Sequence, residues 1–64
     1  MKKLVEKALG FEVVEIKEVA AELAPIDTIY EDEKISVEIL NDRQTYYVTD
    51  VEKDYSFVGY YIAK

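Results

Sequence analysis

The sequence predicts a small α+β domain, in which an N-terminal helical segment packs on one face of a three- to four-stranded antiparallel β-meander. Two observations lead to this prediction: apolar residues recur with a helical period before Pro25 and with a period of two after it. The chain has 64 residues, which suits a single domain over residues 1–64. Half of the residues are apolar, as is typical of a folded chain, although 34% are charged.

The segment from residue 2 to about residue 24 is predicted to be mainly helical. Its apolar residues form one stripe, and Pro25 prevents the helix from continuing. The alternative is a short helix that is capped by Gly10 and followed by a strand over residues 11–16. Continuity of the stripe favours helix through most of residues 12–23, and a break near the glycine is compatible with it. The stripe consists of Val5, Leu9, Val13, Ile16, Ala20 and Leu23.

The predicted meander covers about residues 27–63. Directly after its first acidic turn, the sequence predicts a β-hairpin. Apolar and polar residues alternate over residues 34–39, as in a strand with one buried face. Residues 41–42 are Asn-Asp, which tolerate the positive φ of a two-residue turn. The register set by this turn pairs Ile39 with Gln44, Val37 with Tyr46 and Ile35 with Val48.

All six tyrosines lie after Pro25, and the register of the last strand decides which face most of them take. A four-residue loop would place Tyr46 over Gly59 and Phe57 in the core beneath the helix. A five-residue loop would instead send Phe57 outward beside Tyr47. In the favoured register the face away from the helix gathers an apolar patch, which is predicted to bind a partner. The patch consists of Leu40, Tyr47, Val58, Tyr60 and Ile62.

Two other interpretations of this face stay open. If the sheet curls strongly, or if the N-terminal segment covers both faces, the tyrosines are ordinary core and rim residues. If the patch pairs with itself, the chain is a structural homo-oligomer, such as a homo-dimer. The apolar pattern is the same in each case.

Catalytic and metal-binding chemistry is disfavoured by the residue types present. The chain has no histidine and no cysteine, so Ser36 and Ser56 have no imidazole to activate them and no structural zinc site is expected. The carboxylates of Asp50, Glu52 and Asp54 have the spacing of the first ligands of a calcium loop. Tyrosines stand where that loop needs its glycine and its glutamate. We therefore expect no enzyme, no cofactor and no metal site.

The formal net charge of −6 limits the classes of partner. It disfavours direct binding to nucleic acid or to an anionic membrane, and it attracts a basic protein surface. On the predicted helix, Glu15, Glu18 and Glu22 share one face and form a second candidate site for a partner. No segment resembles a signal peptide or a membrane span, so the expected compartment is the cytoplasm.

These features predict a small, acidic, non-enzymatic protein that docks on another protein. An inhibitor or an anti-defence protein of a mobile element is one concrete form of this prediction. The alternatives are the homo-oligomer and a designed scaffold without natural function. The regular Lys/Glu-rich N-terminal half fits a scaffold, whereas Gly10 and the exposed tyrosines fit it less well.

Overall fold

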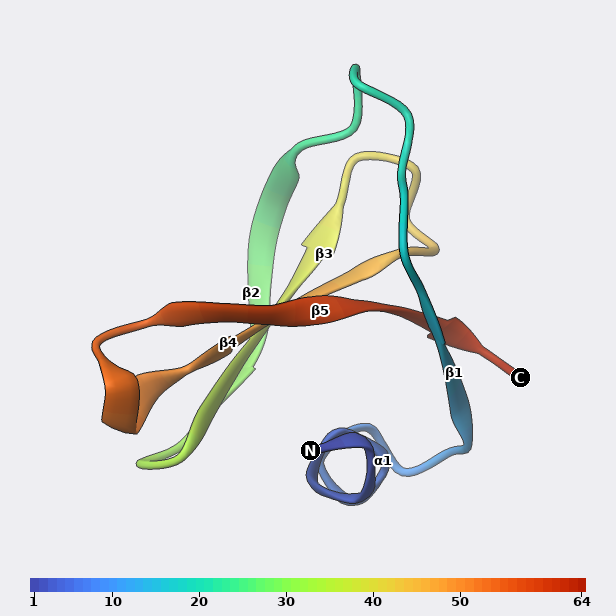
Figure 1. Cartoon of the computed structure of the whole chain (residues 1–64). Coiled ribbons are helices and arrows are strands. Elements are labelled where there is room, and N and C mark those ends of the chain that lie inside the picture. Colours follow the sequence, from blue (N-terminus) through green and yellow to red (C-terminus); the bar gives the residue numbers. More distant parts are fainter.

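The computed structural model describes the whole chain, residues 1–64, as one α-helix packed on a five-stranded antiparallel sheet (Figure 1). The strands follow the order β1-β5-β4-β3-β2, so the first and last strands of the sequence are neighbours. The predicted α+β class is confirmed, with one strand more than the sequence indicated. The elements are α1 (Lys2–Leu9), β1 (Val13–Ile16), β2 (Pro25–Glu31), β3 (Ile35–Leu40), β4 (Tyr46–Asp50), the 3₁₀ turn η1 (Val51–Lys53) and β5 (Ser56–Ala63).

The helix is much shorter than predicted because it ends at Gly10. This residue has a φ of 86°, in the left-handed region, and its N–H donates a hydrogen bond of 2.8 Å to the carbonyl of Glu6. The carboxylate of Glu6 also accepts the N–H of Val13 at 2.9 Å, which fixes the start of β1 against the helix. The prediction of helix over residues 12–23 is wrong, and the alternative, a strand after the glycine, is confirmed.

Residues 17–24 form an irregular connection between β1 and β2 rather than a helix. The end of this β1–β2 connection is hydrogen-bonded to Asn41 of the β3–β4 connection. The backbone N–H of Asn41 donates to the carbonyl of Ala24 at 2.9 Å. The side-chain amide of Asn41 donates to the carbonyl of Glu22 at 3.1 Å. The two connections therefore run together at one end of the sheet, as Figure 1 shows.

The predicted β3–β4 hairpin is present, but its register differs by two residues. Val37 faces Val48 and Ile39 faces Tyr46. The connection accordingly occupies residues 41–45 instead of a two-residue turn. A shift of two residues leaves every side chain on its expected face, because side chains alternate with a period of two.

The last strand, β5, also lies two residues from the favoured register. Val48 faces Gly59, so the prediction that Tyr46 covers this glycine is wrong. Nearer the β4–β5 loop, Thr49 faces Phe57, and a bulge between these two pairs changes the register by one residue. The side chain of Phe57 is 53% exposed, so its predicted place in the core is wrong and the alternative, an outward position, is confirmed.

A single hydrophobic cluster lies between α1 and the sheet. Val5 is the residue of α1 that is fully buried in it. Each of β1, β3, β4 and β5 contributes at least one buried side chain from the face that it turns to the helix. Half-buried apolar residues, Tyr46 among them, pack around this centre. The cluster consists of Val5, Val13, Ile35, Val37, Val48 and Tyr61.

We expect Gly10→Ala to lower the free energy of unfolding by about 1–2 kcal/mol, because an L-residue with a Cβ adopts the left-handed region at that cost. Urea denaturation measures the change. Gly59→Ala is the matched control, because Gly59 has no positive φ. The atom closest to its new Cβ would be a carboxylate oxygen of Glu15, at 2.8 Å, and this exposed side chain can move away. Equal losses in the two variants would contradict the role given to Gly10.

Candidate partner-binding surface

The face of the sheet away from α1, here called the outer face, carries a continuous row of side chains across all five strands. Val37 and Val48 point into the core, so their strand neighbours Glu38 and Tyr47 point to the outer face. The pairing of the strands extends this row to both edges of the sheet. In the order β2, β3, β4, β5 and β1 the row is Thr28, Glu38, Tyr47, Tyr60 and Ile16.

Three aromatic rings meet on the outer face, and Tyr47, Phe57 and Tyr60 are here called the aromatic cluster. The ring centroid of Phe57 lies 5.3 Å from that of Tyr47 and 5.0 Å from that of Tyr60. The two tyrosine centroids are 5.7 Å apart. The rings are tilted against one another, an arrangement that aromatic pairs favour at these distances. The bulge in β5 is the reason why Phe57 and Tyr60, three residues apart, lie on the same face.

The structure divides the patch that the sequence predicted. Tyr47 and Tyr60 belong to the aromatic cluster, and Ile62 is half-buried opposite Val14 of β1. Leu40 is on the outer side of β3, but only 1% of it is exposed, so it has no surface to offer a partner. Val58 packs against the core, so its assignment to the exposed patch is wrong. Phe57 takes its place.

The three carboxylates predicted on one helix face do not share a face, because no helix forms there. Glu15 lies in β1, with its carboxylate above Gly59. Glu18 and Glu22 are exposed in the irregular connection before β2. The prediction of an acidic helix face is therefore wrong.

A hydrogen bond between distant parts of the sequence closes one end of the outer face. The hydroxyl of Tyr55, after η1, donates to a carboxylate oxygen of Glu31 at 2.7 Å, and the hydroxyl of Ser36 donates to the other oxygen at 3.2 Å. The bond to Glu31 raises the pKa of Tyr55. Tyr55 has a φ of 63° and Asp54 one of 58°, two left-handed residues in succession that turn the ring toward β2. Such a contact over 24 positions leaves no local signal in the sequence.

Each of the three connections in the β2–β5 meander is held by an aspartate that accepts backbone N–H groups. These side chains replace the hydrogen bonds that a regular turn or ladder would supply. Part of the acidic composition therefore belongs to the fold and not to a partner site. Asp32 accepts from Lys34 and Ile35, Asp42 accepts from Gln44 and Thr45, and Asp50 accepts from Lys53.

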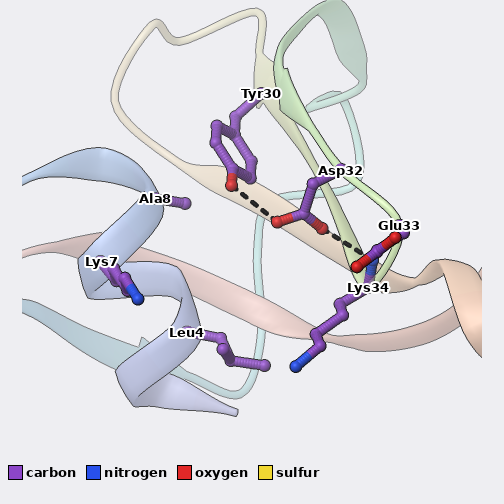
Figure 2. A pocket seen from close by; sticks show the side chains of 7 residues that line it. All are labelled: Leu4, Lys7, Ala8, Tyr30, Asp32, Glu33 and Lys34. Atoms are coloured by element: carbon purple, nitrogen blue, oxygen red, sulfur yellow. Dashed lines mark hydrogen bonds between the residues drawn. The ribbon is translucent and has the colours of Figure 1, made fainter.

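A groove of about 470 Å³ lies between α1 and the β2–β3 turn (Figure 2). At its rim the hydroxyl of Tyr30 donates to Asp32 at 2.6 Å. This bond and the two backbone N–H bonds lower the pKa of Asp32, and the same contact raises the pKa of Tyr30. Neither group is suited to exchange protons near neutral pH. The groove is lined by Leu4, Lys7, Ala8, Tyr30, Asp32, Glu33 and Lys34.

We expect Tyr30→Phe to raise the pKa of Asp32 toward its ordinary range, because the hydroxyl of Tyr30 is the largest cause of its lowering. A lowered folded-state pKa stabilises the fold above the unfolded pKa of about 4, and this contribution is lost as the pH falls through the folded pKa. The variant should therefore lose less stability on acidification than the parent chain. NMR titration of the side-chain carboxyl groups measures the shift.

Asp42 is the internal control in that titration. Its pKa is also lowered, chiefly by the hydroxyl of Thr45, which Tyr30→Phe leaves in place. An unchanged pKa of Asp32, or an equal change at Asp42, would contradict the assignment.

Comparison with known proteins gives no relative: no protein-family model, no curated protein and no solved structure matches the chain. Within the structure, no group of three or more acidic side chains is arranged to hold a metal ion. No helix has the length and apolar character to cross a membrane.

Proposed function

We propose that this chain is a non-enzymatic protein-binding module that docks on another protein through the aromatic cluster. The exposure of Phe57, in contact with two tyrosine rings, carries the proposal. Full burial of a phenylalanine side chain stabilises by about 1.5–3 kcal/mol, and more than half of the surface of Phe57 remains to be covered. Aromatic residues held in this way are typical of the energetic centre of a protein interface.

The chemistry of the groove beside α1 supports binding rather than catalysis. Of its two carboxylates, Asp32 is already engaged by three donors and Glu33 is exposed to solvent, and its hydroxyl, Tyr30, has a raised pKa. The lysines in the lining are exposed, and no nucleophile lies beside a base. We therefore assign no reaction to the protein.

An inhibitor or anti-defence protein that covers a basic surface of its target is the concrete form of the proposal. The net charge of −6 supports it, because an acidic chain is drawn to a basic protein surface and repelled by nucleic acid and anionic membranes. The cytoplasm is the compartment that we assign to this function.

A structural homo-dimer is the second candidate. The observation that favours it is again the aromatic cluster with its exposed Phe57, because a patch on one copy pairs with the same patch on a second copy across a two-fold axis. In this form the partner of the cluster is another copy of the chain.

We expect a photo-reactive phenylalanine analogue at position 57 to cross-link a partner protein in cells of the source. The same analogue at Ile29, an exposed apolar residue of β2, is the matched control and should give no such product. Tyr47→Ala should abolish the cross-link from position 57. Because Phe57 is mostly exposed, replacing it should cost the fold no more than the ring contacts, about 0.5–1.5 kcal/mol. Equal cross-linking from both positions would overturn the proposal.

Sedimentation at micromolar concentration separates the two candidates. The docking proposal predicts a monomer of 7.4 kDa, because in that proposal the aromatic cluster binds a different protein and not a second copy of the chain. The homo-dimer predicts twice that mass and a return to monomer on Phe57→Ala. A dimer that this substitution leaves intact would contradict pairing through the aromatic cluster.

A further inference from the structure

The outer face combines its aromatic rings with a carboxylate that lacks a cation. Glu38 is half-buried and stands directly opposite Tyr47 in the row across the sheet. The one ion pair of the chain joins Lys64 to Glu12 at 4.0 Å, so Glu38 has no cationic partner. No basic residue occurs in the row itself. A negative group is thus placed beside the half-buried ring of Tyr47, with nothing to neutralise it.

A ring face and a carboxylate side by side favour one kind of ligand group. The faces of tyrosine and phenylalanine are the negative part of their quadrupole, and they attract a cation within about 6 Å of the ring centroid. A guanidinium is planar, so it stacks on a ring while its N–H groups donate to a neighbouring carboxylate. The pair of Tyr47 and Glu38 offers both contacts from adjacent strands.

Charge also distinguishes among the possible occupants of this face. A second copy of the chain would bring a further charge of −6 and place its own Glu38 against the same surface. Nucleic acid would bring phosphates to a face without a basic residue in its row. A basic protein segment is the occupant whose charge complements both Glu38 and the whole chain.

We infer that the outer face recognises an arginine-bearing segment of a partner protein, whose guanidinium stacks on the aromatic cluster and pairs with Glu38. This inference rests on the proposed function, because it names the chemistry of the partner at the same site. Arginine is preferred over lysine, whose compact ammonium lacks the plane for stacking and the fork for bidentate hydrogen bonds.

The test uses a synthetic peptide in which arginines alternate with serines, and a second peptide with citrulline in place of each arginine. Citrulline has a similar shape and no charge. We expect the arginine peptide to cause saturable NMR shifts centred on Glu38 and the aromatic cluster, and the citrulline peptide to cause none. A lysine peptide should bind more weakly than the arginine peptide.

Two matched variants locate the contact. Glu38→Gln should weaken binding of the arginine peptide by about three- to tenfold, and Phe57→Ala should weaken it by a similar factor. Glu33→Gln removes the same charge at the exposed β2–β3 turn, so it should change the dissociation constant less than about twofold. The amide spectra of all three variants confirm that the fold is kept.

Equal effects of Glu38→Gln and Glu33→Gln would overturn the inference, because they would indicate general attraction between opposite charges. So would shifts that centre on the turn aspartates. If the arginine peptide does not bind while position 57 still cross-links a partner, the inference fails and the proposed function stands. If neither result is obtained, both fail.

Discussion

The pairing of β1 with β5 is the contact on which the rest of the structure depends. It joins the two ends of the sequence and gives the sheet its fifth strand. Gly10 makes it possible, since its left-handed backbone ends the helix and lets the chain return alongside the sheet. Val13 then enters the core beside Tyr61, and α1 is held over the face that they share. Without this pairing β5 would be an edge strand, and the small core would lose the buried side chain that β1 contributes, Val13.

The two faces of the sheet carry different side chains because the side chains of each strand alternate. One face closes over Val5 of the helix, and the other bears the aromatic cluster and Glu38. The bulge in β5 modifies this division at one place: it shifts the alternation by one residue and leaves Phe57 beside Tyr60. A single irregularity in the ladder thus enlarges the exposed aromatic surface.

The sequence was sufficient for the α+β class, for the β3–β4 hairpin and for the faces of Tyr47 and Tyr60, since these follow from local periodicity. It was insufficient for β1, because the apolar spacing of that segment also fits a helix and its partner strand lies at the far end of the chain. The strand registers could not be predicted from the sequence for a different reason. Loop lengths are set by aspartate side chains and by left-handed residues such as Arg43 and Tyr55, neither of which is a usual turn residue.

Both open edges of the sheet are poor templates for a further strand. At β1, the N–H of Val13 is not free, because the carboxylate of Glu6 accepts it. At β2, Ile26 and Ile29 fall at two irregularities of the ladder, where they pair with no residue of β3. Natural sheets use such interruptions to avoid edge-to-edge aggregation. The aromatic cluster on the outer face therefore lies between two edges that offer little regular backbone for a further strand to pair with.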